Sequence, residues 1–291
     1  MDGAALMDEH DRLHPDPGHA PGQGTTDGPI VNRQPLANSP LLQAEIVTIR
    51  NPGPASIPFA SVPCAVALIP LSGALCLEWD SGTVWMDLNQ VILVPAGMTL
   101  RQRHPVAGDV AYMSVSCPPG PFGQAGECTV LPIGADLQRE AMRLATLISW
   151  CEALSPAIRE EALWIILDQV AAMKPLERAT PRGGRSLTLV QRIRELVQET
   201  STPRSLKDLA ASVGASPVYL TSLFRQIEGM PIYRYQARLR LARSLRRLGE
   251  TDDITTVAMD LGFANHSHFT TAFKGAFGLT PSAYKASLNI C

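Results

Sequence analysis

Two short groups of side chains near the carboxyl end of this 291-residue chain have the types needed to contact the edges of DNA bases. One group follows Pro217 and the other follows Asn265. Hydroxyl and imidazole groups can hydrogen-bond to several base edges, and a valine can contact a thymine methyl group. The positions expected to contact bases are Val218, Thr221, Ser222, His266, Ser267, His268 and Thr271.

Basic and capping residues surround both groups. Lys and Arg side chains, and the free N–H groups at helix N-termini, bind phosphates without regard to base sequence. The candidate phosphate contacts are Arg204, Ser216, Arg225, Arg238, Arg240, Asn265 and Lys274. An arginine in this region could equally lie on a solvated helix face or pair with Asp253 or Asp260.

The charges are distributed unevenly along the chain. Residues 182–291 carry 15 Lys and Arg against 8 Asp and Glu, whereas residues 1–181 carry 10 against 19. A polyanion would therefore meet the second part of the chain. The acidic first part is expected to contact a partner other than DNA or to bind a small molecule.

The first group belongs to a predicted helix-turn-helix unit over residues 203–226. Its apolar positions recur at three- and four-residue steps, as Leu206, Leu209, Ala210 and Val213, then Leu220, Leu223 and Phe224. Gly214 is expected to end the first helix, since glycine tolerates the left-handed conformation at a helix end. Ser216 then caps the second helix, with Pro217 in its first turn. Two helices joined by a short turn with glycine are typical of a DNA-binding unit.

The second group belongs to a repeat of this pattern about 50 residues later, over residues 253–274. The apolar positions are Ile254, Val257, Ala258 and Leu261, then Phe269 and Phe273. Gly262 is the expected helix end and Asn265 the expected cap of the next helix. Internal repetition of one supersecondary unit makes a chance match less credible.

A helix over residues 232–248 is predicted between the two units. Its apolar stripe is formed by Tyr235, Leu239, Ala242, Leu245 and Leu248, and arginines occupy much of the rest. A helix of about 15 residues spans about 22 Å. It could hold two recognition helices in successive major grooves, which lie about 34 Å apart.

Three stretches together resemble the AraC/XylS family of bacterial regulators, namely residues 205–229, 238–248 and 254–285. The most specific positions are Gly262-Phe263, Phe269, Phe273, Phe277-Gly278, Thr280-Pro281 and Tyr284. The resemblance covers about a third of the chain. It implies a seven-helix DNA-binding domain with two helix-turn-helix units that bind promoter sites. Members often add an N-terminal cupin-like domain that binds an effector or dimerises.

Two positions depart from the family pattern. Pro231 comes one place early after Gly229 and is followed by Ile232, and Ser244 stands where alanine is usual. Both are structural positions, so they leave the direction of the connecting helix open.

The region before the linker is predicted to be rich in short strands, which favours a sandwich or barrel. The predicted strands are Ala44–Ile49, Cys64–Leu71, Leu75–Trp79, Thr83–Leu88, Gln90–Val94 and Val110–Ser116. Asp80-Ser81-Gly82 is expected to form a hairpin turn. The segment 94–97, Val-Pro-Ala-Gly, resembles a turn common in cupin-like strands.

Two amphipathic helices are predicted next, separated by Ser155-Pro156. Their apolar stripes are Leu137, Ala141, Leu144, Leu147, Ile148 and Cys151, then Ile158, Ala162, Ile165, Ile166, Gln169 and Val170. An antiparallel helix pair of this kind can dimerise or pack on the strands. The expected domains are an N-terminal disordered arm at 1–40, a cupin-like domain at 41–174, a linker at 175–186 and a double helix-turn-helix domain at 187–291. The fold class is α+β, with the cupin-like β-barrel and its two helices followed by an all-α domain.

A small-molecule site in the barrel is a second prediction. Pockets of small barrels are mostly apolar with a few polar groups. The candidate lining residues are Trp79, Trp85, Arg101, Arg103, His104 and Tyr112. The tryptophans could instead be core, and Arg101 and Arg103 could form one solvated strand face.

An enzyme is the contrasting hypothesis, and the sequence argues against it. His104 is the only histidine between residues 41 and 180, so the histidine cluster of metal-dependent cupins is absent, and neither a metal nor another cofactor is expected. No GxSxG, P-loop or CxxC pattern occurs. The six cysteines fit neither a zinc site nor a disulfide framework, and the N-terminus lacks a signal peptide. We therefore expect a cytoplasmic protein that is not an enzyme.

These observations predict a sequence-specific DNA-binding transcription factor, with promoter DNA as its partner and no membrane partner. An effector or dimerisation through the N-terminal domain would modulate it, and the alternative is a constitutive regulator whose N-terminal domain only dimerises. RNA polymerase, a small-molecule effector and a second copy of the chain are candidate partners. An activator role is one expectation, while the target genes and the direction of regulation stay open.

Overall fold

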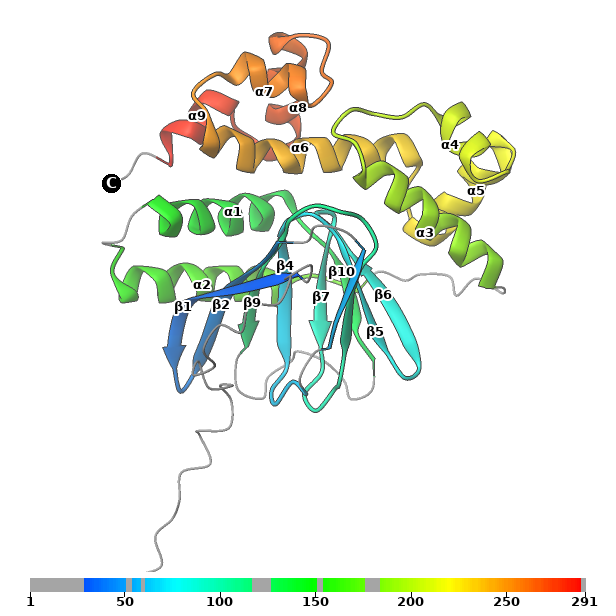
Figure 1. Cartoon of the computed structure of the whole chain (residues 1–291). Helices are drawn as coiled ribbons and strands as arrows, with labels where there is room; N and C mark the ends of the chain where they lie inside the picture. The colour runs from blue at the N-terminus through cyan, green and yellow to red at the C-terminus, as the bar shows by residue number, and fades with distance from the viewer. Residues whose placement is uncertain are drawn as a thin grey trace, which may run out of the picture.

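The computed structural model describes residues 29–50, 54–58, 61–116, 127–150, 154–175 and 184–288. Figure 1 shows the strands at the bottom, a pair of helices (green) beside and above them, and the remaining helices along the top. Within the described residues, all strands precede all helices in the chain. The predicted α+β class, with a β-rich first part and an all-α second part, is confirmed.

The larger sheet has six strands in the order β1-β2-β9-β4-β7-β10. All its pairs are antiparallel. The strands are β1 (Ile30–Ser39), β2 (Leu42–Arg50), β4 (Val66–Ser72), β7 (Gln90–Val94), β9 (Val110–Ser116) and β10 (Thr129–Pro132).

The smaller sheet has four strands in the order β3-β8-β5-β6. They are β3 (Ala55–Pro58), β5 (Leu75–Trp79), β6 (Gly82–Met86) and β8 (Arg101–His104). Trp79 pairs with Gly82, so the hairpin turn predicted at Asp80-Ser81 is confirmed. The predicted barrel is therefore not closed, because the β-rich part is built from two separate sheets that face each other.

Side chains of the larger sheet alternate between two cores because successive residues of a strand point to opposite faces. Leu68 and Ile92 lie in the core between the two sheets, together with Leu77 and Met86 of the smaller sheet. Their neighbours on the same strands face the helices instead, in the core that contains Ala67, Ile69, Val91 and Leu93. Both faces of the larger sheet are therefore covered.

Helices α1 (Ala135–Trp150) and α2 (Pro156–Ala171) form the pair predicted after the strands. The Ser155 hydroxyl caps α2 by accepting a hydrogen bond from the Ile158 amide. The stripe predicted for α2 is partly wrong, since Ile158 and Ile165 are 52% and 50% exposed while Leu163 and Leu167 are buried. The helix is apolar on more than one face, so residue spacing alone did not identify the buried one.

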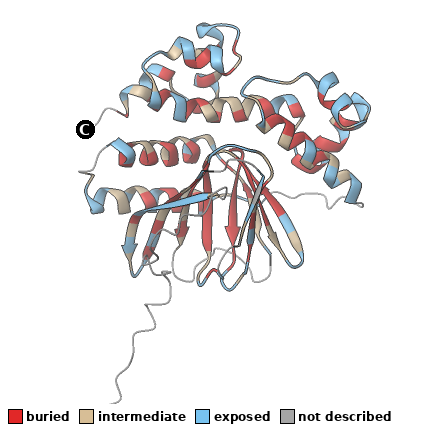
Figure 2. Cartoon of the chain, in the orientation of Figure 1, coloured by how far each residue is buried: buried red, intermediate tan, exposed pale blue. Residues whose placement is uncertain are grey.

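Among the described residues, seven helices follow α2, the number that the family resemblance implies for the DNA-binding domain. They are α3 (Gly184–Gln198), α4 (Leu206–Ser212), α5 (Pro217–Glu228), α6 (Ile232–Glu250), α7 (Ile254–Asp260), α8 (His266–Phe277) and α9 (Pro281–Ala286). In Figure 2, buried residues of these helices face one another and exposed residues lie along the outer rim. None of the described helices is long and apolar enough to cross a membrane.

The boundaries differ from the prediction at the N-terminal arm and at the linker. Residues 30–39, placed in a disordered arm, form strand β1, and most of its side chains are exposed. Because β1 is held mainly by backbone hydrogen bonds to β2, its sequence lacks the alternation of apolar and polar residues that would have predicted a strand. Helix α3 begins at Gly184, inside the linker predicted at 175–186. Residues 1–28 of the arm and 176–183 of the linker lie outside the described residues.

Candidate nucleic-acid interface

The first helix-turn-helix unit consists of α4 and α5. The Ser205 hydroxyl caps α4 by accepting from the Asp208 amide at 3.1 Å. Gly214 adopts a φ of 63° in the turn, the left-handed region that glycine reaches without strain. The Ser216 hydroxyl then accepts from the Tyr219 amide at 3.3 Å, with Pro217 in the first turn of α5. The predicted turn and cap are both present.

The second unit consists of α7 and α8 and repeats this design. Asp253 caps α7 by accepting from the amides of Thr255 and Thr256 at 2.8 and 3.1 Å. Gly262 has a φ of 71°, and a Cβ atom there would lie 2.9 Å from the Pro203 ring. Asn265 Oδ1 accepts from the His268 amide at 2.7 Å. Turn geometry and close packing both require glycine at position 262.

One face of each recognition helix is buried in its own unit. In α5 this face contains Leu220 and Phe224, and the Phe224 ring meets Tyr235 of α6 edge-on at 5.2 Å. In α8 it contains Phe269 and Phe273, whose rings meet edge-on with centroids 5.6 Å apart. The apolar face anchors each helix, so the opposite face is left for a partner.

The predicted base-contacting residues lie on these opposite faces. Val218 is 82% exposed and Ser222 is exposed beside it. Thr221 is half-buried, and its hydroxyl donates to the Pro217 carbonyl at 2.9 Å. His266, Ser267, His268 and Thr271 are all exposed on α8. The His268 ring rests edge-on against Phe263 with centroids 5.8 Å apart, which restrains its orientation.

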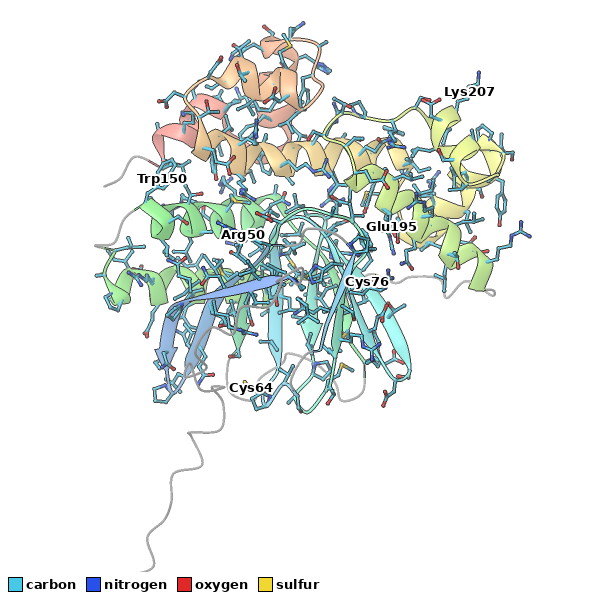
Figure 3. All side chains as sticks on the ribbon, in the orientation of Figure 1. Arg50, Cys64, Cys76, Trp150, Glu195 and Lys207 are labelled. Atoms are coloured by element: carbon cyan, nitrogen blue, oxygen red, sulfur yellow. The ribbon has the colours of Figure 1, made fainter. Side chains whose placement is uncertain are left out.

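The predicted phosphate-contacting residues form two groups. Arg225 and Lys274 are exposed in the last turns of α5 and α8, and Arg204 pairs with Glu199 at 3.2 Å. The capping side chains Ser216 and Asn265 are exposed at the starts of the two recognition helices. Figure 3 shows Lys207 of α4 extending outward beside the first unit, a basic residue that the sequence did not single out.

Arg238 and Arg240 of α6 are engaged within the chain. Arg238 donates to the Ile133 carbonyl at 2.8 Å, across the boundary between the two parts of the chain. Arg240 donates to the Gly262 carbonyl at 3.2 Å and lies 4.7 Å from the Phe263 ring centre. Burial lowers the pKa of both guanidinium groups. In this conformation the two arginines hold α6 to its neighbours.

Gln226 is a further candidate that the sequence analysis did not select. It lines an open groove on α5 together with Val218, Ser222 and Arg225. It follows Ser222 by four residues, which places it on the same helix face. A glutamine can make a bidentate contact with adenine. Helical spacing extended by one more turn would have found it.

The turn between β6 and β7 contacts the DNA-binding part of the chain directly. Asp87 is fully buried and accepts hydrogen bonds from the Trp85 indole at 2.9 Å and from the Tyr235 hydroxyl of α6. Burial, with Asp87 nearby, raises the pKa of Tyr235, so its hydroxyl stays protonated and donates. Leu88 enters the buried cluster formed by Leu220, Tyr235 and their neighbours.

The six candidate ligand residues of the β-domain do not gather at one site. The smaller sheet separates them, because neighbouring residues of a strand face opposite sides. On the outer face of the smaller sheet, Arg103 forms an ion pair with Glu78 at 2.6 Å and contacts Cys76. Trp85 packs against Cys76 on the same face. Arg101 is exposed and pairs in register with Glu78 on the neighbouring strand. Trp79 and Tyr112 pack with the core between the sheets.

His104 is fully buried, and neither ring nitrogen has a hydrogen-bond partner. Burial lowers its pKa to about 4. On the same strand, Gln102 donates to the Tyr112 hydroxyl at 2.8 Å. The neutral imidazole is thus confined to a site that disfavours its charged form.

Sequence comparison agrees with this geometry. A family model described as a helix-turn-helix domain matches residues 209–287, which run from α4 to the end of α9. The regulatory protein PocR of Salmonella typhimurium is 28% identical over 122 residues, covering 42% of this chain and 39% of PocR. The activator RhaS of Pectobacterium carotovorum is 43% identical over 70 residues, covering 23% of this chain and 25% of RhaS.

A third relative, the activator AarP of Providencia stuartii, is 32% identical over 84 residues, which cover 28% of this chain and 62% of AarP. This chain therefore matches less than two thirds of the length of each of these relatives. Among solved structures, a regulator with an AraC-type DNA-binding domain from Chromobacterium violaceum is 27% identical over 37% of this chain and 98% of its own, with a TM-score of 0.34. ToxT of Vibrio cholerae is 10% identical over 86% of this chain and 99% of its own, with a TM-score of 0.33.

The seven C-terminal helices, with two capped and exposed recognition helices, define a double helix-turn-helix domain. This part of the chain is an AraC-type helix-turn-helix domain, as its sequence pattern predicts.

Proposed function

We propose that this protein is a transcription factor that binds promoter DNA in a sequence-specific manner through both helix-turn-helix units. The observation that carries the proposal is the pairing of two exposed recognition faces, on α5 and α8, at opposite ends of a single helix, α6. Each face presents hydroxyl or imidazole groups that can hydrogen-bond to bases. Cytoplasmic location follows from this role.

The length of α6 supports simultaneous use of both units. It has 19 residues, which corresponds to about 28 Å of helix. Successive major grooves on one face of the duplex lie about 34 Å apart. One chain could therefore contact two grooves without a second copy.

Affinity should depend strongly on phosphate contacts. The exposed candidates for base contact include no arginine or lysine, whereas Arg225 and Lys274 are exposed beside them. Phosphate contacts release counterions, so salt should weaken binding to all sequences. Selecting bound sequences from a random DNA pool, followed by gel shift at several salt concentrations, tests the proposal. Equal retardation of selected and scrambled DNA would exclude it.

The contacts between the two parts of the chain support control by the N-terminal domain. The β6–β7 turn is bound to α6 through Asp87 and Tyr235, and Arg139 of α1 donates to the Phe277 carbonyl at the end of α8 at 2.9 Å. The N-terminal domain thus contacts both the connecting helix α6 and the second helix-turn-helix unit. A ligand that favours one arrangement of this domain would shift the population competent for DNA. A thermal-shift screen against metabolites tests this part.

A constitutive regulator with a dimerising N-terminal domain is the second candidate. Helix α2 exposes Ile158, Trp164 and Ile165, at 52%, 46% and 50%. Such apolar residues on one helix suit a contact with a second copy. A dimer in light scattering, together with no stabilising metabolite in the thermal-shift screen, would favour this candidate.

RNA polymerase is the partner we propose for either form at a promoter, since RhaS and AarP are named activators.

A further inference from the structure

A cavity of about 470 Å³ lies between the N-terminal domain and the DNA-binding domain. On one side it is lined by the end of β4, at Leu71 and Ser72, by the adjacent Gly73, and by Leu88 of the β6–β7 turn. On the other side it is lined by α6 and α7. A ligand there would touch both parts of the chain, in a volume that suits a small metabolite.

Three arginines of α6 line this cavity, but two of them are neutralised. Arg246 pairs with Glu250 at 2.7 Å, and Arg247 pairs with Asp260 at 2.6 Å. Both of these carboxylates also line the cavity. These two pairs therefore contribute no net charge to it.

Arg243 is the third arginine, and its charge lacks this compensation. It donates to the Thr200 carbonyl at 2.7 Å and to Gln198 Oε1 at 2.6 Å, both neutral acceptors. Among the described residues, no carboxylate lies within ion-pair distance of it. Burial lowers the pKa of Arg243, and the nearby charge of Asp87 acts in the opposite direction by raising it. The lining of the cavity thus has one positive charge in excess.

Ser72 supplies a second unsatisfied group on the opposite wall. Its hydroxyl oxygen is buried, and no hydrogen-bond partner is present. The turn that follows Ser72 packs closely on its neighbour, because a Cβ atom on Gly73 would lie 2.6 Å from the Asp109 carbonyl oxygen. A buried hydroxyl without a partner costs free energy until a ligand or water pairs with it.

We propose that this cavity binds a small anion, with a carboxylate or phosphate group held by Arg243 and Ser72. The guanidinium donates charge-assisted hydrogen bonds to the anion, and the serine hydroxyl donates from the opposite wall. The bound anion would join the end of β4 to α6. This inference deepens the effector part of the proposed function, but its test measures anion binding directly.

The test titrates the full chain with inorganic phosphate in one arm and citrate in the other, at constant ionic strength set with NaCl. Calorimetry should give saturable binding in one arm, and that arm identifies the preferred group. Arg243→Gln and Ser72→Ala should each weaken this binding at least about tenfold, as expected when a hydrogen bond to a charged group is lost. Arg234→Gln, at an exposed arginine of the same helix that does not line the cavity, is the matched control and should change it less than about twofold.

Ser72→Ala keeps the test decisive if Arg243→Gln fails to fold, because the serine hydroxyl makes no hydrogen bond that the fold would lose. Absence of saturable binding in both arms would overturn the proposal. Equal affinity of the wild type and the Ser72 variant would overturn it as well. Gel shift of the same preparations separates this outcome from the proposed function, since DNA binding would then persist without anion binding.

Discussion

The hydroxyl of Tyr235, in the helix that joins the two helix-turn-helix units, donates a hydrogen bond to Asp87 in the β6–β7 turn. Both residues are buried, at 1% and 0% exposure. The bond therefore links the two parts of the chain in a region without solvent.

Replacing this hydroxyl should weaken the contact between the domains. We expect Tyr235→Phe to lower the free energy of unfolding by about 1–3 kcal/mol, the usual cost when a buried polar group loses its partner. The ring stays, so its packing against Phe224 is kept. Urea denaturation measures the change. Tyr233→Phe, at a tyrosine of the same helix that is 73% exposed, is the control. Equal effects of the two substitutions would contradict the role of the bond.

His104 should make the stability of the fold depend on pH. Its pKa falls from 6.5 to about 4 on burial, so between these values the unfolded chain binds more protons than the folded chain. Stability should therefore fall as the pH drops from 6.5 towards 4, by up to about 3 kcal/mol from this group. Denaturation of the wild type and His104→Leu across this range measures the difference. Parallel pH profiles for the two proteins would rule out the contribution.

Substitutions on the two recognition helices should alter base preference at different positions. Thr221→Ala and His268→Ala should each reduce discrimination at one half of the site, by about 1–3 kcal/mol for a lost base contact. Competition gel shifts with single-base variants of the selected site measure this. Ser282→Ala, at an exposed residue of α9, provides the control. If base preference survives both substitutions, the placement of the recognition faces is wrong.

Arg225 should act on every DNA sequence alike. Arg225→Gln should weaken binding to specific and non-specific DNA by a similar factor, because phosphates carry no sequence information. The slope of log affinity against log salt should fall by about 0.9 for one lost phosphate contact. Arg246→Gln, which breaks a pair with Glu250 on α6, is the control and should leave the slope unchanged. A loss confined to the specific site would indicate base contact instead.

The helix-turn-helix units were predictable because their signals are local. Ser216 and Asn265 cap helices whose amides lie three residues away, and Gly214 and Gly262 end helices through their own backbone conformation. Residue types at fixed short spacing are sufficient for such features. The same holds for the β5–β6 hairpin, whose turn directly follows Trp79.

Contacts between distant parts of the chain were not predictable in this way. Arg238 was expected on DNA, yet it bonds the carbonyl of Ile133, which lies 105 residues earlier. Leu88 was placed at the end of a strand, but it enters a core built by the DNA-binding helices. Strand β1 is defined by its register with β2 and not by its own side chains. Each of these features depends on a partner that composition and periodicity do not identify.

The most direct test of the double-unit account is a footprint of the full chain on a DNA site selected from a random pool. We predict two protected major-groove segments on one face of the duplex, with centres about 10 base pairs apart. Thr221→Ala should weaken protection of one segment, and His268→Ala should weaken protection of the other. A single protected segment, or loss of the same segment in both variants, would contradict the account.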